Sequence, residues 1–318
     1  MHDHSTRAQP NRHHSRGKTV AAVVAVLSFV AAAVILGPAI AHSAQPDDLT
    51  ISSAPEASSP SIEATSPSHD LAIEIVQPGR EGLELTARLT DDGGLIERNI
   101  SWTIRDADGA TVFSGATDTA DVSVPPGDYA VEIRYGSVTL SSTITLLEAN
   151  RVMVSYVLNA GGLRILPRVR DMALPASGSE VRVFSLGGRH NGKLVAVSDI
   201  PGEVLRVPEG DYRVESRFAA GNAQAVTDVH VKAGRMSAVD IDHKAGIARL
   251  AFVGSPSAEV LWNVEDGSGQ KVAAAAGLNA DVVLVPGTYT ASAKVGSEVM
   301  TATFEIGTGE ARDIILGN

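Results

Sequence analysis

Apolar and polar residues alternate along most of the chain after residue 70. The alternating apolar positions include Leu83, Leu85, Ala87 and Leu89, then Val131 and Ile133, Val229 and Val231, and Val239 and Ile241. Alternation over about four to eight residues, bounded by Gly, Pro, Asp and Asn, is typical of half-buried antiparallel strands. No stretch after residue 41 has the helical period, so the pattern predicts an all-β protein.

One strand-and-turn unit is repeated three times. Its clearest landmark is a short corner built from Val, Pro, Gly and Tyr, and the corner tyrosine recurs at nearly equal spacing, at Tyr129, Tyr212 and Tyr289. A large aromatic residue precedes each tyrosine at a nearly constant distance, at Trp102, Phe184 and Trp262. A period of about 80 residues exceeds that of solenoid repeats and matches whole small domains.

Each repeat has room for about seven short strands, the number typical of a β-sandwich. Hairpin corners are predicted at matching places, from Asp106 to Gly109, at Asn191-Gly192 and at Asp266-Gly267, because Asn-Gly and Asp-Gly accept positive φ. The predicted fold is three tandem immunoglobulin-like or transthyretin-like antiparallel β-sandwiches. Their predicted bounds are residues 70–158, 159–243 and 244–318.

The repeated aromatic residues are interpreted as structural. Each corner tyrosine should begin a strand with its ring inward, and its hydroxyl should reach back to a free backbone group, as in a tyrosine corner. The Trp or Phe of each repeat should lie at the centre of a core, because large aromatic rings dominate burial energetics. Alternatively, these aromatic residues line a sugar-binding surface. The residues concerned are Trp102, Tyr129, Phe184, Tyr212, Trp262 and Tyr289.

The repeated segments resemble a known kind of module. They read VPPGDYAVEIRYG from Val124 to Gly136, VPEGDYRVESRFAAG from Val207 to Gly221, and VPGTYTASAKVG from Val285 to Gly296. Together with the strand after each, they are similar to bacterial immunoglobulin-like modules, and more narrowly to carboxypeptidase-regulatory-like (transthyretin-like) and PEGA-type domains of exported proteins. This resemblance implies spacer, adhesion or partner-binding roles, and it carries over no catalytic residue.

The segment before the repeats predicts an export address rather than a fold. Residues 1–18 form a basic cytoplasmic tail, and residues 19–41 contain an apolar run that fits either an uncleaved signal anchor or a signal peptide cleaved near Ala41. Either reading leaves the basic flank inside and exports the rest of the chain. Residues 42–69, rich in Ser, Pro, Ala and Thr, predict a disordered linker.

Composition and charge exclude several classes of function. The chain has no cysteine, which rules out disulfides, thiolate metal sites and a cysteine nucleophile. A formal net charge of -11 argues against nucleic-acid binding, since phosphate neutralisation needs clustered Lys and Arg. No cofactor is predicted.

Acidic side chains give the weakest candidates for a site. Asp91, Asp92, Asp106 and Asp108 lie in predicted loops of the first repeat, and Ca²⁺ could be bound there, although Asp is also a common turn residue. A second group, Asp240, Asp242 and His243, is interpreted as a solvated strand edge rather than a metal site.

Two short matches to catalytic motifs are interpreted as turns. Gly187 to Lys193 fits the start of a phosphate-binding loop but ends in Leu194 and an alternating strand, and Ser268 to Lys271 fits S-x-x-K without its accompanying motifs. The chain is therefore predicted to be a non-enzymatic envelope protein in the inner membrane, its bulk in the periplasm or outside, with a protein or glycan partner. The alternatives are secretion after cleavage, and an ion- or ligand-binding protein.

Overall fold

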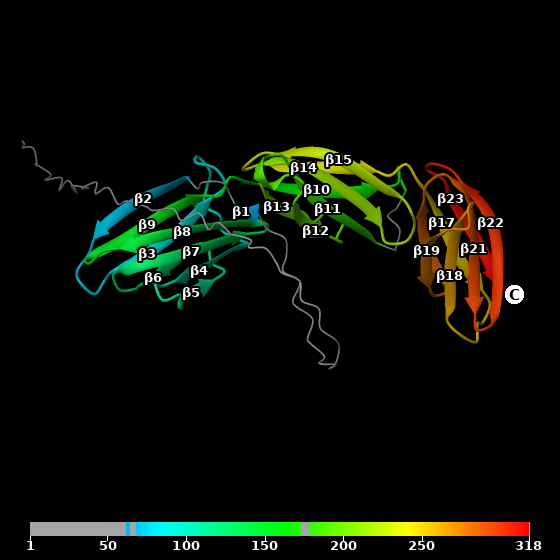
Figure 1. Cartoon of the computed structure of the whole chain (residues 1–318), viewed down its shortest axis with the longest axis horizontal. Helices are drawn as coiled ribbons and strands as arrows, with labels where there is room; N and C mark the ends of the chain where they lie inside the picture. Colours follow the sequence, from blue (N-terminus) through cyan, green and yellow to red (C-terminus); the bar gives the residue numbers. More distant parts are fainter. Residues whose placement is uncertain (1–61, 64–67, 173–177, 318) are drawn as a thin grey trace, which may run out of the picture.

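The computed structural model describes residues 62–63, 68–172 and 178–317. These residues form strands in six sheets, and the helical content of this part of the chain is one short 3-10 turn at Gly188–His190. None of the described helices is long and apolar enough to cross a membrane. The predicted tail and the predicted anchor at 19–41 lie outside the described residues. Figure 1 shows three groups of strands that follow one another along the molecule.

The first group of strands, called the first unit, contains two sheets with the orders β2-β9-β3-β6 and β1-β8-β7-β4-β5. Its strands are β1 (Ile62–Glu63), β2 (Ser68–Ile75), β3 (Gly82–Arg88), β4 (Ile100–Arg105), β5 (Thr111–Gly115), β6 (Ala120–Val122), β7 (Gly127–Tyr135), β8 (Val138–Leu146) and β9 (Asn150–Val157). β1 and the start of β2 lie within the segment 42–69 that composition predicts to be a linker.

The second unit has the sheets β13-β10-β16 and β12-β11-β14-β15. Its strands are β10 (Ala160–Arg168), β11 (Ser179–Leu186), β12 (Leu194–Ser198), β13 (Val204–Pro208), β14 (Gly210–Phe218), β15 (Gln224–Val231) and β16 (Met236–Asp242).

The third unit has the sheets β20-β17-β23 and β19-β18-β21-β22. Its strands are β17 (Gly246–Val253), β18 (Val260–Asp266), β19 (Lys271–Ala276), β20 (Asn279–Leu284), β21 (Gly287–Val295), β22 (Glu298–Ile306) and β23 (Ala311–Gly317).

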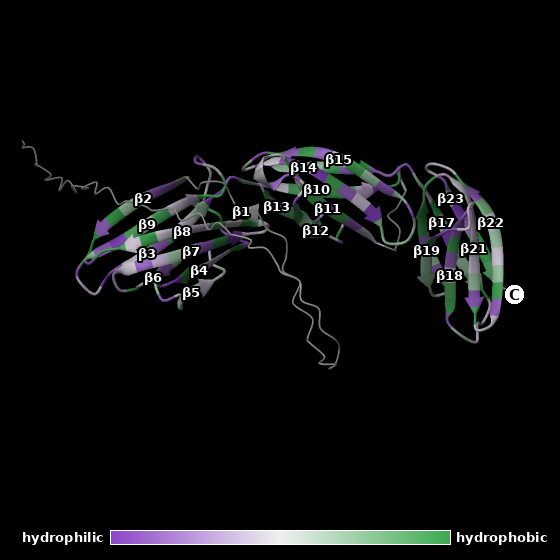
Figure 2. Cartoon of the chain, in the orientation of Figure 1, coloured by the Kyte–Doolittle hydropathy of each residue, from purple (hydrophilic) through white to green (hydrophobic). Residues whose placement is uncertain are grey.

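The two sheets of each unit enclose a buried apolar core. Leu85 and Trp102 belong to one cluster although they come from different sheets, and Leu163 and Val183 do the same in the second unit. Hydrophilic and hydrophobic residues, purple and green in Figure 2, follow one another along the strands, as the alternating pattern requires. Burial of one face of each strand is the main stabilising term of such a fold. The prediction of an all-β, sandwich-like chain is confirmed for the described residues.

Strand direction differs from the prediction in one respect. The first and last strands of the second and third units are parallel neighbours, β10 with β16 and β17 with β23, and β3 pairs with β9 in the same way. The sheets are therefore mixed rather than purely antiparallel. Alternation reports which face of a strand is buried, but it contains no information on which strand lies beside it.

The predicted hairpin corners occur at the predicted places; Gly109 and Gly192 have the expected positive φ, and in the third corner the left-handed glycine is Gly269 instead of Gly267. Oδ1 of Asp106 accepts hydrogen bonds from the amides of Asp108 and Ala110, at 3.1 and 2.9 Å. Asp266 accepts the same two bonds in the third unit, and the left-handed glycines are Gly109 at φ +82° and Gly269 at φ +81°. In the first and third units the turn signal is thus an Asp followed by a Gly three places later, and the adjacent Asp266-Gly267 pair is not the corner.

Candidate interaction surfaces and unit junctions

The two tryptophans occupy equivalent buried positions. Trp102 is 1 % exposed and Trp262 is 2 % exposed. Each indole N–H donates a hydrogen bond of 2.9 Å to a carbonyl further along the chain, on Thr117 and on Gly277. Satisfying the indole N–H lets the ring be buried without an unpaired donor. These geometries fit a core role and leave neither ring available for a sugar.

Phe184 does not occupy the third tryptophan position. In the strand pairing, Trp102 lies opposite Ile133 and Trp262 lies opposite Ala293, each four residues after the corner tyrosine. In the second unit the residue four places after Tyr212 is Ser216, and it lies opposite Val181. Phe184 is half-buried and lies outside the apolar core of its unit. The loop at 187–193, between β11 and β12, is longer than the loops at 106–110 and 267–270. This insertion shifts the sequence spacing, so counting back from Tyr212 selects the wrong residue.

All three corner tyrosines make the same backward contact. The hydroxyl of Tyr129 donates to the carbonyl of Pro125 at 2.6 Å, that of Tyr212 to Pro208 at 2.6 Å, and that of Tyr289 to Val285 at 2.8 Å. All three tyrosines are buried. Burial raises the pKa of Tyr212, so this hydroxyl stays protonated and remains a donor.

The four carboxylates considered for Ca²⁺ lie at opposite ends of the first unit. Asp91 and Asp92 lie between β3 and β4, beside the start of β4, whereas Asp106 and Asp108 follow its other end. The oxygens that bind one ion cannot come from such distant loops. Among the described residues, no group of three or more His, Asp or Glu side chains could hold a metal ion. The structure thus forms no single calcium site from these four residues.

Asp240 and Asp242, at the end of β16, and His243, which follows it, are also separated in their contacts. Asp240 pairs with Arg168 at 3.3 Å, and Asp242 accepts a hydrogen bond from the amide of Arg170 at 2.8 Å. His243, in contrast, is 0 % exposed, and its Nε2 lies 3.0 Å from Oγ of Ser216. The alternating pattern identifies the two exposed aspartates correctly, but it does not reveal that His243 turns into the protein.

His243 lies in the apolar contact between the second and third units. Its ring is 4.7 Å, centroid to centroid, from that of Phe218. The surrounding buried cluster contains Val169, Phe218 and Ala223 from the second unit, and Ala245, Ile247 and Val283 from the third. Burial lowers the pKa of His243 to about 4, although the Asp242 carboxylate acts in the opposite direction. The imidazole is therefore neutral at neutral pH.

Backbone contacts complete this second junction. The amide of Val283 donates to the carbonyl of Ala220 at 3.0 Å, and Gly221 forms an isolated bridge with Val283. The Asn222 side chain donates to the Tyr289 hydroxyl at 3.1 Å and accepts from the amide of Val285 at 2.9 Å. The corner of the third unit is thus bonded directly to the end of the second.

The first junction, between the first and second units, includes polar contacts. The amide of Ser137 donates to the carbonyl of Arg206 at 2.9 Å, and the Arg206 guanidinium lies 5.5 Å from the centroid of the Tyr135 ring. A guanidinium over an aromatic face is a favourable cation–π arrangement. The backbone bond and the ring contact both hold the second unit on the end of the first, and Ala160 at the start of β10 packs into the buried core of the first unit.

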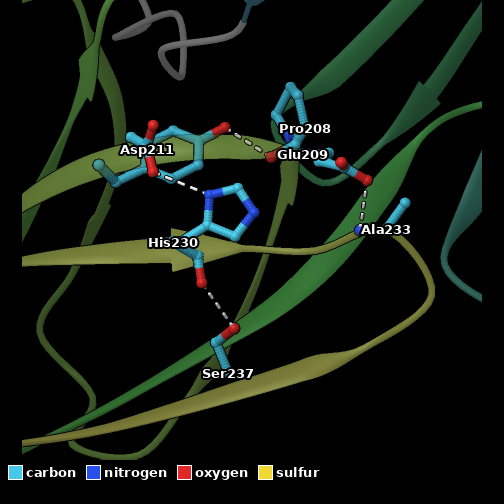
Figure 3. A network of polar contacts seen from close by, with 7 residues as sticks. Pro208, Glu209, Asp211, His230, Ala233 and Ser237 are labelled. Atoms are coloured by element: carbon cyan, nitrogen blue, oxygen red, sulfur yellow. Dashed lines mark hydrogen bonds and ion pairs between the residues drawn. The ribbon is translucent and has the colours of Figure 1, made fainter.

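A polar network holds the loops of the second unit at this same end, since the amide of Glu209 donates to the carbonyl of Asn159 at 2.8 Å. Figure 3 shows Asp211 beside Nδ1 of His230 at 2.8 Å, and the Glu209 carboxylate accepting from the amide of Ala233 at 2.9 Å. Both members of the Asp211–His230 pair are more than half exposed, at 66 and 59 %. Such an exposed pair contributes little to stability.

A repeated glycine marks the junctions. Each of the three motif segments ends on a glycine with positive φ, at Gly136, Gly221 and Gly296. A Cβ on Gly136 would lie 2.6 Å from Cβ of Arg206, and one on Gly221 would lie 1.8 Å from the carbonyl oxygen of Val283. A Cβ on Gly296 would have no atom within 4 Å apart from those of the adjacent residues. The first two glycines therefore permit close approach of the next unit, which the sequence repeat alone does not explain.

Alanine at Gly136 is expected to open the first junction. Gly136 and Gly296 have nearly the same φ, +61° and +59°, so the conformational cost of Gly→Ala is matched between them. Gly136→Ala should speed hydrogen exchange at the Ser137 amide and at neighbouring residues of the second unit. Gly296→Ala should leave exchange at both junctions unchanged. Equal protection in the two variants would show that the Arg206 contact does not hold the junction.

The outer sheet faces differ in charge between units. On β14 and β15, Arg213 forms two parallel bonds with Asp228, at 2.9 and 3.0 Å, and Arg217 bonds Glu180 at 3.0 Å. The Arg213 guanidinium lowers the pKa of the Asp228 carboxyl, and Arg217 does the same to Glu180. The outer positions of β21 and β22 are instead uncharged hydroxyl side chains over most of their length, including Thr290, Ser292, Thr301 and Thr303. The chain thus offers chemically distinct surfaces in sequence.

Comparison with known proteins locates one repeat family. Residues 253–316, within the third unit, match the Rhizobiales growth-associated tandem repeat domain. No curated protein matches the chain. The chain is therefore similar in its third unit to a tandem repeat domain, which agrees with β-sandwich repeat modules.

Solved structures that the chain matches include a Bacillus anthracis protein and two pilins. The Bacillus anthracis TIE protein is 15 % identical, with a TM-score of 0.24, over 74 % of this chain and 50 % of its own. A streptococcal ancillary pilin is 13 % identical, with a TM-score of 0.27, over 74 % of this chain and 98 % of its own. The minor pilin of Streptococcus agalactiae is 13 % identical, with a TM-score of 0.24, over 50 % of this chain and 95 % of its own. Overlaps of this size carry no functional conclusion.

Proposed function

We propose that this chain is a non-enzymatic envelope protein that presents β-sandwich units, held in a fixed series, to a protein or glycan partner. The observation that carries the proposal is the pair of junctions. Backbone bonds and, at the second junction, a buried apolar cluster with His243 hold each unit against the next. A packed junction limits the relative motion of neighbouring domains, so the surfaces of successive units keep a defined spacing.

The proposal extends to domain count and location. We take each unit to be an independently folded domain, of the carboxypeptidase-regulatory-like or PEGA-like kind that the repeated motif resembles. We place the chain in the inner membrane through residues 19–41, with the units in the periplasm or outside, or released after cleavage near Ala41. The mass of the mature chain separates these two: a chain starting at residue 1 or 2 is anchored, and one starting near His42 is released.

Photo-crosslinking in intact cells tests the partner. A photoreactive amino acid is introduced at one exposed outer position of each unit, at Thr143, Glu215 and Thr301, in the full chain. We expect a reproducible protein or glycan adduct from at least one position. The matched control carries Gly136→Ala as well, and it should lose or shift adducts that require two units at once. No adduct from any position would contradict the proposal.

A further inference from the structure

The first unit adds its own N-terminal strands to the edges of both of its sheets, so β9 and β8 are not edge strands there. β2 pairs with β9 as an antiparallel neighbour along its whole length, from Ser68↔Val157 to Ile75↔Asn150. β1 lies on β8 through two further pairs. An uncovered edge presents unpaired backbone N–H and C=O groups that invite another strand, so covering it is a common protective device.

The last strands of the other two units have no such cover in the part of the chain that the structure describes. β9, β16 and β23 are equivalent, because each is the parallel neighbour of the first core strand of its unit. β16 has β10 as its single neighbour, and β23 has β17. Figure 1 shows β17 and β23 side by side in the third unit.

The direction of the free backbone groups follows from the parallel register. The amide of Ile247 on β17 donates to the carbonyl of Glu310 at 2.8 Å, with Ile247 opposite Ala311. Glu310 and every second residue after it along β23 thus direct their backbone N–H and C=O groups toward β17. The residues between them, Ala311, Asp313 and Ile315, direct their backbone N–H and C=O groups toward the free edge.

The two free edges differ in how they are guarded. On β16, Asp240 and Asp242 follow each other on the outer face, and charges at an edge discourage strand addition. On β23, Asp313 is the one charged residue of that face, and it faces Arg249 at 3.9 Å. Ile315 is 64 % exposed there, and Val253 on the adjacent β17 is 55 % exposed. β23 therefore combines an outward-facing backbone edge with an exposed apolar side chain, Ile315, beside a single ion pair.

We propose that β23 binds an extended segment of a partner polypeptide, which adds to its free edge as an antiparallel strand with apolar residues at alternating positions. The pairing of β2 with β9 supplies the geometry, because the same kind of strand already covers the equivalent edge of the first unit. Backbone bonds then provide affinity, and contacts with Ile315, on β23 itself, provide selectivity. This inference rests on the proposed function, since it names the class of partner.

A synthetic peptide with the sequence of β2, SHDLAIEI, is the probe, and the full chain is the target. We expect saturable binding by fluorescence anisotropy, with amide shift changes in β23 when the labelled chain is followed by NMR. Asp313→Pro removes an N–H at the free edge without breaking the bonds to β17, and it should weaken binding about tenfold. Ala238→Pro, at the equivalent position of β16, should leave the affinity unchanged.

A peptide with N-methyl groups on alternate amides keeps the test decisive if the proline variant fails to fold. It should not bind the unmodified chain, because its backbone donors are blocked. Absence of binding by the unmodified peptide, exchange onto β9 instead of β23, or self-association of the chain through β23 in sedimentation would each overturn the inference. Adducts at Thr143, Glu215 or Thr301 in cells would leave the proposed function standing in all three cases.

Discussion

Replacing Trp102 with alanine is expected to lower the free energy of unfolding of the first unit by about 3–5 kcal/mol, as truncation of a buried large aromatic residue does. The indole is 1 % exposed, belongs to the core cluster of both sheets, and lies 6.3 Å from the Tyr156 ring, centroid to centroid. The truncation removes apolar contacts, leaves a cavity, and frees the carbonyl of Thr117. Trp262→Ala should have the same effect on the third unit.

Urea denaturation followed by circular dichroism measures this loss, and Phe184→Ala is the matched control. Phe184 is half-buried outside the core, so its truncation should cost about 1 kcal/mol. A similar loss of unfolding free energy for Phe184→Ala and Trp102→Ala would show that Phe184 is a core residue equivalent to Trp102 and Trp262. An unchanged stability for Trp102→Ala would show that the ring is a surface group.

Acidification is expected to weaken the second junction through His243. Its pKa is about 4 in the folded chain and about 6.5 when unfolded, so between these values the unfolded state binds more protons. The stabilisation is complete above about pH 6.5 and is lost as pH falls toward 4, by about 3 kcal/mol in total. Carboxylates with lowered pKa values, such as Asp228, lose their contribution at still lower pH.

The measurement is the free energy of unfolding from pH 7 to pH 4 for the unmodified chain, His243→Gln and His230→Gln. His243→Gln should flatten the pH dependence between 6.5 and 4, because glutamine does not titrate. His230 lies outside the second junction, so His230→Gln is the comparison variant for the loss of a histidine elsewhere in the chain. A slope that persists in His243→Gln would place the titrating group elsewhere.

The local features of the fold could be predicted from the sequence because they are encoded by neighbours. The alternation at Leu83 and Leu85, the Asp106 turn and the Tyr129 corner each depend on a few adjacent residues, and the structure contains all three. The three corner tyrosines also make the predicted backward bond, because each hydroxyl reaches a carbonyl four residues earlier in the chain.

The features that could not be predicted depend on contacts between distant segments. The parallel pairing of β10 with β16 joins the first and last strands of the second unit, and nothing in either strand specifies its neighbour. The spacing predicts Phe184 as the aromatic residue of the second core, but the longer loop between β11 and β12 changes this spacing, and Val181 has the equivalent position. His243 follows two exposed aspartates, and its burial arises only when the third unit packs against Phe218. The repeated glycine at Gly136 and Gly221 was visible, but its role needs the next unit in place.

Distance measurement between spin labels tests the central claim, that the units are held in a fixed series by packed junctions. The chain contains no cysteine, so cysteines introduced at Thr143 and Glu215, or at Glu215 and Thr301, carry the labels without background. The account predicts one narrow distance distribution for each pair, with Gly136→Ala broadening the first pair alone. A broad distribution for either pair in the otherwise unmodified chain would contradict it, because the units would then be linked but not docked.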